Sequence, residues 1–145
     1  MKDQVSFPIS ARDIIPHAPS ILMIDKLIDF KDCACTVEAI VSPDNIMLDE
    51  NNMLNQSAII EIIAQASAAF KGCEDKINGK ELTRGFLVGI KKIQFHNSVF
   101  SGDKILINIK ITTNFSGFTV MDGKVLRDGQ IIASASMKLW VPEQS

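Results

Sequence analysis

One carboxylate stands in an otherwise apolar stretch, SAIIEIIAQASAAF, which spans residues 57–70. Ser57 precedes Glu61 by four residues and Gln65 follows it by four, so on a helix the three polar side chains form one narrow stripe. A carboxylic acid kept away from bulk water stays neutral more readily and can give a proton to a leaving hydroxyl group. Glu61 is therefore the first candidate catalytic residue, and Ser57 and Gln65 either orient it or bond to each other. The alternative is a structural carboxylate that the helix dipole favours near a helix start.

The second candidate is a histidine between two prolines. Pro16 and Pro19 disfavour a continuous helix around His17, which predicts an ordered loop there. Imidazole changes its charge near neutral pH and can act as a base, whereas a loop histidine without a chemical role is the alternative. The other histidine, His96, follows Phe95 in a strand pattern and is expected to be exposed and inert.

These side chains need elements to position them, and the apolar pattern predicts a helix over residues 56–71. Asn55 is suited to cap its start, and Gly72 is expected to follow its end. Because the helix is apolar nearly all round, we expect protein to surround most of it. Residues 72–84 are expected to form a basic, polar connection with a turn at Asn78-Gly79.

The second half of the chain is typical of antiparallel strands. Isoleucines alternate with polar residues over 104–112, and Asp128-Gly129 marks a hairpin between two apolar runs. An earlier strand is predicted from Cys33 to Val41, with Cys33 and Cys35 on the same face. The pattern predicts a single α+β domain over residues 1–145, in which an antiparallel sheet curls around one long helix.

Composition excludes several classes of protein. The chain has 145 residues, 46% of them hydrophobic, and a net charge of −2, which gives no electrostatic case for nucleic acid. No apolar run is long enough to span a bilayer, and the N-terminus lacks a signal-peptide core, so we expect a cytoplasmic protein without a membrane partner. Three cysteines do not suggest a disulfide framework, and the lone C-x-C favours packing over metal. We expect no cofactor and no metal, because neither a nucleotide-binding nor a zinc motif is present.

Three segments in this order resemble the hotdog-fold 3-hydroxyacyl-[acyl-carrier-protein] dehydratases. They are IIPHAPSILMIDKLID, IIEIIAQASAAF and FLVGIKKIQFHNSVFSGDKILINIKI, and the resemblance runs from about Asp13 to Val141. The chain looks especially like the dehydratase-like proteins of aryl polyene clusters. The resemblance implies a sheet wrapped around a central helix, in a homodimer or larger even-numbered assembly whose active sites lie between subunits.

The resemblance also assigns roles to residues. Glu61 matches the helix carboxylate of the family, but Met47 stands where its members carry the usual catalytic histidine. The proline-glycine pair before the family's helix is Asn55-Gln56 here. His17, whose loop lies beside the substrate tunnel in related enzymes, becomes the best available base, approaching Glu61 from the neighbouring subunit.

Four residues are expected to contact the substrate. Gln65 and Ser57 do so beside Glu61, while Phe86 and Gly89 lie in the strand FLVGI. A glycine inside a strand lets a substrate approach the backbone, and a β-bulge is the structural alternative.

The resulting hypothesis is dehydration of 3-hydroxyacyl thioesters to 2-enoyl thioesters, on acyl carrier protein or coenzyme A. One alternative is a hotdog thioesterase, in which the helix carboxylate alone activates water or attacks the carbonyl. Another is a non-catalytic partner subunit or thioester binder, as the departures at Met47 and Asn55-Gln56 suggest. The basic segment 71–92 either docks an acidic carrier or its phosphate, or is a charged surface connection; its cations are Lys71, Lys76, Lys80, Arg84, Lys91 and Lys92.

Overall fold

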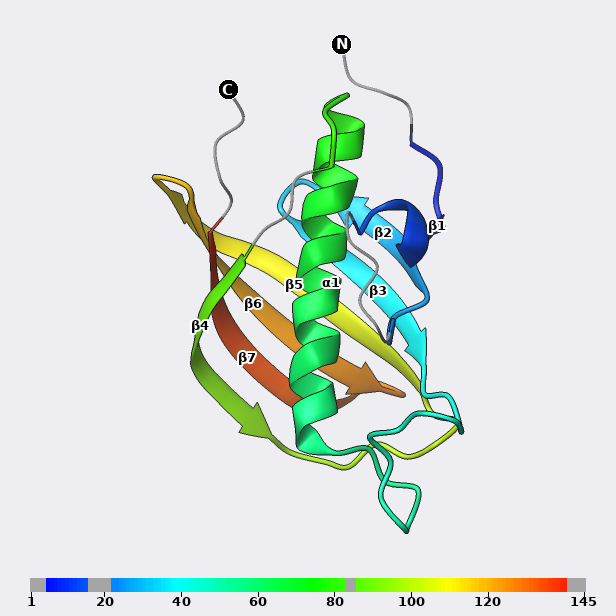
Figure 1. Ribbon diagram of the computed structural model, residues 1–145. Helices are drawn as coiled ribbons and strands as arrows, with labels where there is room; N and C mark the ends of the chain where they lie inside the picture. Colours follow the sequence, from blue (N-terminus) through cyan, green and yellow to red (C-terminus); the bar gives the residue numbers. More distant parts are fainter. Residues whose placement is uncertain (1–4, 16–21, 83–85, 141–145) are drawn as a thin grey trace.

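The computed structural model describes residues 5–15, 22–82 and 86–140. It contains one long helix against one curved sheet (Figure 1). The elements in chain order are β1 (Ile9–Ser10), a 3-10 turn (Ala11–Asp13), β2 (Lys26–Lys31), β3 (Ala34–Ile40), α1 (Gln56–Ile77), β4 (Phe86–Phe95), β5 (Lys104–Phe115), β6 (Phe118–Arg127) and β7 (Gln130–Trp140).

The sheet has seven strands in the order β1-β2-β3-β5-β6-β7-β4, and every neighbouring pair is antiparallel. Asp128 and Gly129 both have positive φ angles, 52° and 79°, so the predicted hairpin between β6 and β7 is confirmed. A second tight turn, at Ser116-Gly117, joins β5 to β6 with φ angles of 49° and 84°. This turn was not predicted from the sequence, because Ser-Gly is a weaker hairpin signal than Asp-Gly.

Helix α1 begins as predicted but ends later. The Asn55 side chain accepts a hydrogen bond from the Ser57 amide at 2.8 Å, which confirms the cap. The expected end before Gly72 is wrong, because the helix continues to Ile77 and stops at the predicted Asn78-Gly79 turn. A Cβ at Gly72 would clash with the backbone oxygen of Ile14. Close packing therefore requires this glycine, which does not mark the helix end.

The core lies between α1 and the concave face of the sheet. Ile105, Ile107 and Ile109 point inward from β5, and the alternation predicted for this strand is confirmed. Phe70 of α1 stacks on Phe30 of β2 with ring centroids 5.1 Å apart. Close approach is also required at β6, since a Cβ at Gly123 would lie 2.8 Å from Ile63 of the helix.

One detail of the predicted first strand is wrong. Cys35 is buried on β3, but Cys33 lies in the exposed turn before it, so the two cysteines do not share a face. Asp32, in the same turn, has a positive φ of 55°, which breaks the strand before Cys33.

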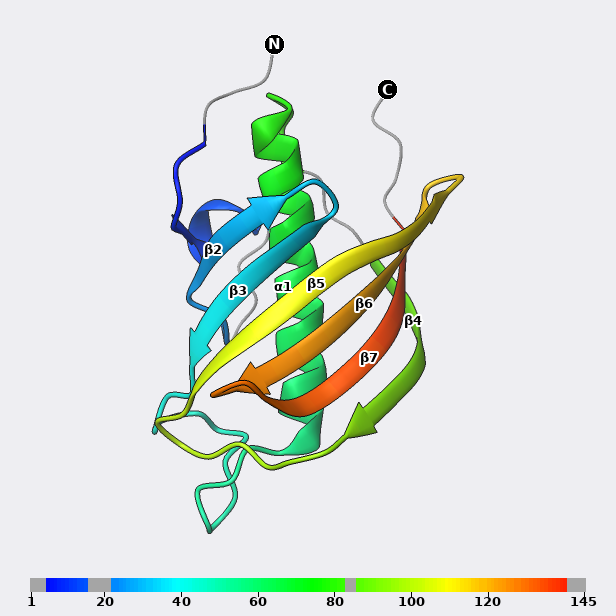
Figure 2. The same cartoon turned by 180° about the vertical axis from the view of Figure 1, so that it is seen from behind.

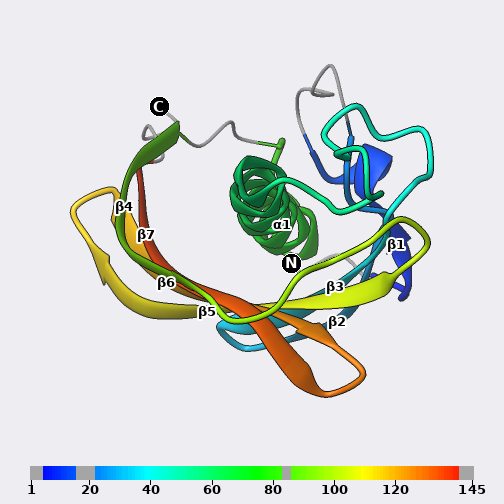
Figure 3. The same ribbon diagram turned by 90° about the horizontal axis from the view of Figure 1, so that it is seen from below.

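The sheet curls around one side of the helix, as Figures 2 and 3 show, which confirms the predicted antiparallel sheet around one helix. The opposite side of the helix carries Ser57, Glu61, Ala64 and Ala68, all exposed or half-buried. No helix within the described ranges is long and apolar enough to cross a membrane.

Candidate active site

The carboxylate of Glu61 lies on the open side of α1. We expected this side chain to be buried, and that prediction is wrong for the single chain, because Glu61 is exposed while its neighbours Ile62 and Ile63 are buried. The reason is geometric: the sheet covers one side of the helix, and Glu61 projects from the other. Among the described residues, no element covers this position.

Gln65 holds the carboxylate in place. Its side chain is 5% exposed, and its Nε2 donates a hydrogen bond to Oε1 of Glu61 at 3.1 Å. Its own Oε1 accepts a hydrogen bond from the Met23 amide at 2.8 Å. The amide therefore bridges the segment before β2 to the helix carboxylate, and its oxygen and nitrogen are assigned by these partners. The part played by Met23 could not be predicted from the sequence, because every residue except proline has the backbone N–H that donates here.

Ser57 plays no part in this bridge. It lies one turn before Glu61 on the same stripe, as its spacing predicts, but within the described residues its side chain makes no hydrogen bond to Glu61. It is exposed beside the helix cap. A role for Ser57 toward a substrate stays a prediction.

Gly89 lies in β4 opposite Lys138, next to a register shift between Leu87 and Gly89. A register shift at this point agrees with the β-bulge given as the structural alternative. A Cβ at Gly89 would meet nothing within 4 Å, so no neighbour among the described residues requires a glycine here. Phe86 begins β4 opposite Trp140, and its side chain lies outside the described part of the structure.

The two histidines differ in how far the structure describes them. His17 lies within residues 16–21, outside the described residues, so its approach to Glu61 stays a prediction. His96 follows the end of β4 and is exposed, as expected.

The loop before the helix carries no acid or base at the position where the family has histidine. Met47 is half-buried and packs against the core. Its carbonyl accepts a hydrogen bond from the Asn55 amide at 2.9 Å, which ties the loop to the helix cap. A thioether cannot exchange protons, so Met47 cannot take the role of a histidine at this position.

The basic segment 71–92 does not form one surface. Lys71 bonds to Glu74 and Asp75 of its own helix, each at 3.1 Å. Burial acts to lower the pKa of Lys71, but the carboxylates of Asp75 and Glu74 outweigh it and raise the pKa. Lys71 is therefore a structural ion-pair partner, whereas Lys92 lies on β4, on the far side of the sheet from the helix.

Two of the cysteines, Cys35 and Cys73, have unreactive thiols. Burial raises the pKa of Cys35 to about 12 and that of Cys73 to about 11, and each also receives smaller electrostatic contributions from its surroundings. Thiols protonated at neutral pH are poor nucleophiles and poor metal ligands. Among the described residues, no group of three or more histidine, cysteine or acidic side chains could hold a metal ion.

Comparison with protein families and relatives gives a consistent result. A family described as ApeP-like (ApeP dehydratase) matches residues 9–145. The bifunctional enzyme LpxC/FabZ of Chlorobaculum tepidum is 30% identical over 99% of this chain, which spans only 32% of that longer protein. The 3-hydroxyacyl-[acyl-carrier-protein] dehydratase FabZ of Campylobacter lari is 25% identical, with 90% of this chain and 94% of the relative covered.

Solved structures share the fold. The dehydratase heterocomplex ApeI:P from Xenorhabdus doucetiae contains a chain with a TM-score of 0.84 at 18% identity, covering 94% of this chain and 93% of that one. A Streptococcus mutans protein bound to acetyl CoA has a TM-score of 0.70 at 16% identity, covering 89% of this chain and 96% of its own. These likenesses confirm the predicted hotdog fold.

Proposed function

The chain belongs to the ApeP-like dehydratase family, and we propose that it converts carrier-bound 3-hydroxyacyl thioesters to 2-enoyl thioesters. Membership makes it a lyase-type enzyme, as the sequence predicted. The free cysteines at positions 33, 35 and 73 agree with action in the reducing cytoplasm.

The reaction needs one base and one acid. The thioester carbonyl makes the α-proton acidic, and neutral His17 takes that proton. The electron pair of the broken C–H bond forms the Cα–Cβ double bond, and the Cβ–O bond breaks. Glu61, in its protonated form, gives its proton to the departing hydroxyl group, which leaves as water.

The observation that carries this proposal is the Gln65 bridge. The buried Gln65 amide donates one hydrogen bond to Glu61 and accepts one from the backbone of Met23, which ties the carboxylate to the segment before β2. General acid catalysis needs such positioning, since the proton must lie within hydrogen-bond reach of the leaving oxygen. A surface carboxylate without a chemical role needs no buried bridge.

We propose that a second copy of the chain completes the site. Glu61 is exposed in one chain, and a water-filled site weakens the electrostatic control of proton transfer. A homodimer that covers the open side of α1 would exclude water there and bring His17 of one copy toward Glu61 of the other.

A complementation experiment tests these roles together. His17→Ala and Glu61→Gln are each expected to abolish hydration of a 2-enoyl thioester, the reverse reaction. If the two residues act across the interface, unfolding and refolding an equal mixture restores about a quarter of the wild-type activity, because half the dimers are mixed and each has one intact site. A mixture as inactive as its parents, with mixed dimers present, would contradict the shared site.

One observation favours a second candidate function, that of a partner subunit. Met47 replaces the proton-transferring residue of the loop with a packed thioether. Such a chain would have no dehydratase activity by itself. It would raise the turnover of a second hotdog subunit that supplies its own histidine. Activity of the purified chain by itself excludes this role as its sole function.

A further inference from the structure

Aromatic side chains gather at one end of the sheet, on the face turned away from α1. Phe115 and Phe118 lie opposite each other beside the tight turn that joins β5 to β6, and Phe118 also lies opposite Trp140 of β7. Thr119 and Leu139 are buried beneath the sheet, so the alternation of a strand turns Phe118 and Trp140 to the outer face. We call Phe115, Phe118 and Trp140 the aromatic tip.

Much of the aromatic tip is in contact with water. Phe115 is 72% exposed and Trp140 is 40% exposed, although large aromatic side chains gain free energy when they leave water. Figures 1 and 2 show that the β5–β6 hairpin projects beyond the neighbouring strands, at the end of the sheet where α1 ends. The tip is therefore the first part of the molecule to meet a surface that approaches from this end.

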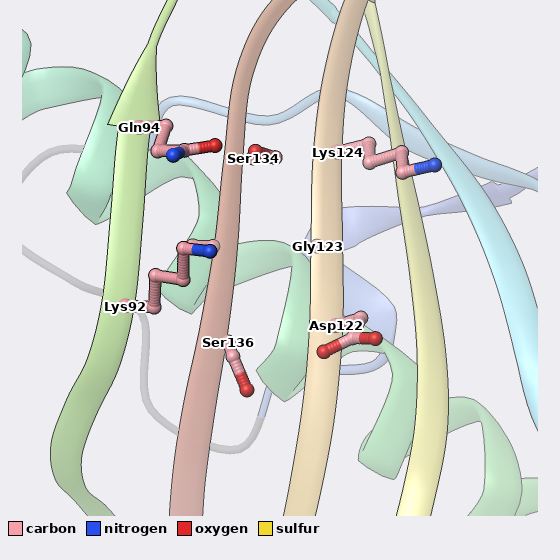
Figure 4. Close-up of a pocket in the computed structure, with 8 residues that line it drawn as sticks. Lys92, Gln94, Asp122, Gly123, Lys124, Ser134 and Ser136 are labelled. Carbon is pink, nitrogen blue, oxygen red and sulfur yellow. The ribbon is translucent and has the colours of Figure 1, made fainter.

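The apolar surface is confined to this end of the outer face. Figure 4 shows the middle of the same face, where the labelled side chains, among them Gln94, Ser134 and Ser136, are polar. Lys138 lies between the two regions on β7, and its Nζ is 4.3 Å from the centre of the Phe118 ring. The aliphatic part of a lysine covers apolar surface while its ammonium group stays at a polar boundary. The tip thus has an apolar end and a cationic rim.

Positive charge predominates on the strands that carry the tip. The strands β4, β5, β6 and β7 contain six lysines and one arginine but one carboxylate, that of Asp122. Lys104 and Arg127 bond to carboxylates outside these strands. Lys110 and Lys138, which precede the tip residues on β5 and β7, form no ion pair within the described residues. The whole chain has a net charge of −2, so this end differs in sign from the average.

We propose that the aromatic tip docks on the surface of an anionic lipid bilayer. The rings of Phe115 and Trp140 enter the boundary between headgroups and acyl chains, and Lys138 stays at the level of the phosphates. Phenylalanine, tryptophan and lysine are the residue types that hold peripheral proteins at this boundary, and each lysine near an anionic bilayer adds attraction. The expectation of no membrane partner rested on the lack of a spanning segment, which a peripheral contact does not need.

The size and shape of the tip favour a bilayer over a second protein. A specific protein interface covers about 800 Å² on each partner. An aromatic side chain that is fully exposed offers only about 150–250 Å², and the rings of the tip are partly covered. Lipids rearrange around a small projecting tip, so a bilayer needs no surface of matching shape.

Docking in this way leaves the candidate active site open. Glu61 lies in the second turn of α1, whereas the hairpin projects at the end of the sheet where α1 ends (Figure 1). The inference does not rest on the proposed function, and membrane contact is measured without any substrate.

Trp140 is the single tryptophan of the chain, so its fluorescence reports on the tip directly. The wild type is mixed with phosphatidylcholine vesicles that contain phosphatidylserine, and with matching vesicles whose acyl chains carry bromine. We expect the emission of Trp140 to shift to shorter wavelength and the brominated chains to quench it. An emission that neither shifts nor is quenched would overturn the proposal, and this result needs no variant.

Three variants assign the contact to the tip, and thermal unfolding checks that each is folded. Phe115→Ser should weaken vesicle binding about tenfold, because one large apolar side chain leaves the contact. Lys138→Gln should weaken it about fivefold when phosphatidylserine is present and should not change binding to phosphatidylcholine alone. Phe100→Ser is the matched control and should leave binding unchanged: Phe100 is 42% exposed, but it pairs with Met53 where α1 begins.

Two outcomes with these variants would contradict the proposal. One is equal weakening in Phe115→Ser and Phe100→Ser, which would make the contact a general effect of exposed phenylalanine. The other is a wild type that does not bind vesicles but assembles through the tip, so that Phe115→Ser lowers its oligomeric state.

Discussion

Substitution of Gln65 separates the two halves of the bridge that positions Glu61. Glutamate has the same shape as glutamine and can still accept the Met23 hydrogen bond, but when ionised it cannot donate to Glu61. Methionine has a similar length and can do neither. Comparing Gln65→Glu with Gln65→Met therefore tests the anchor and the catalytic contact independently.

The burial of Gln65 sets the expected loss of stability in each variant. Gln65 is 5% exposed, so Gln65→Met leaves the Met23 amide without its acceptor, which costs about 1–3 kcal/mol of the free energy of unfolding. For a chain of this size this lowers Tm by about 4 °C for each kcal/mol. Gln65→Glu keeps the acceptor, and we expect it to retain most of the stability but to lose at least tenfold in kcat at neutral pH, because the Nε2 donor that positions Glu61 is gone.

The assay combines thermal unfolding with hydration of a 2-enoyl thioester over a range of pH. Ser67→Ala is the matched control, since the buried Ser67 hydroxyl donates to the Ile63 carbonyl at 2.9 Å and has no link to Glu61. Wild-type activity of Gln65→Glu at every pH would refute the positioning role.

The other predictions concern stability. Gly72→Ala should displace the Ile14 backbone and cost about 1–3 kcal/mol in urea unfolding, whereas a change below about 0.5 kcal/mol would contradict the close packing. The Cys35 thiol has a raised pKa in the fold, so it stays protonated while the unfolded thiol ionises above its ordinary value of 9.0, and stability falls as the pH rises. The advantage of wild type over Cys35→Ala should therefore shrink by about 1.4 kcal/mol between pH 7.5 and pH 10; a constant difference would refute this. Arg127→Met should cost about 1–3 kcal/mol in the same unfolding assay, because Arg127 donates to the Ser98 carbonyl at 2.7 Å and to Asp103 at 2.9 Å; an unchanged midpoint would contradict it.

The fold was predicted mainly from the spacing of apolar residues along the sequence. Alternation over β5 and the apolar run of α1 reflect which side chains face the core, and that information is local to each element. The helix end was misplaced because glycine usually ends helices, whereas Gly72 is needed by the distant Ile14. No local pattern reports that contact.

The candidate site was only partly predictable for the same reason. The four-residue spacing placed Glu61 and Gln65 on one stripe, and the structure joins them by a hydrogen bond. Which side of the helix the sheet leaves open depends on the packing of the whole chain, so the exposure of Glu61 could not be predicted. The outer face of the sheet depends on the register between strands far apart in sequence, so nothing local to Lys92 or Lys124 shows that they lie on the two strands that flank β7.

The central claim is that this chain is a dehydratase that uses Glu61 as its acid. It is tested most directly by the steady-state hydration of a short 2-enoyl thioester by the purified chain alone, followed by loss of the conjugated absorbance. We predict turnover by the wild type and a loss of at least a hundredfold in Glu61→Gln, because in hydration Glu61 takes the proton from the attacking water, the reverse of its role as acid in dehydration. Unchanged turnover in Glu61→Gln, release of free thiol in place of hydration, or a wild type that binds the thioester without converting it would contradict the claim.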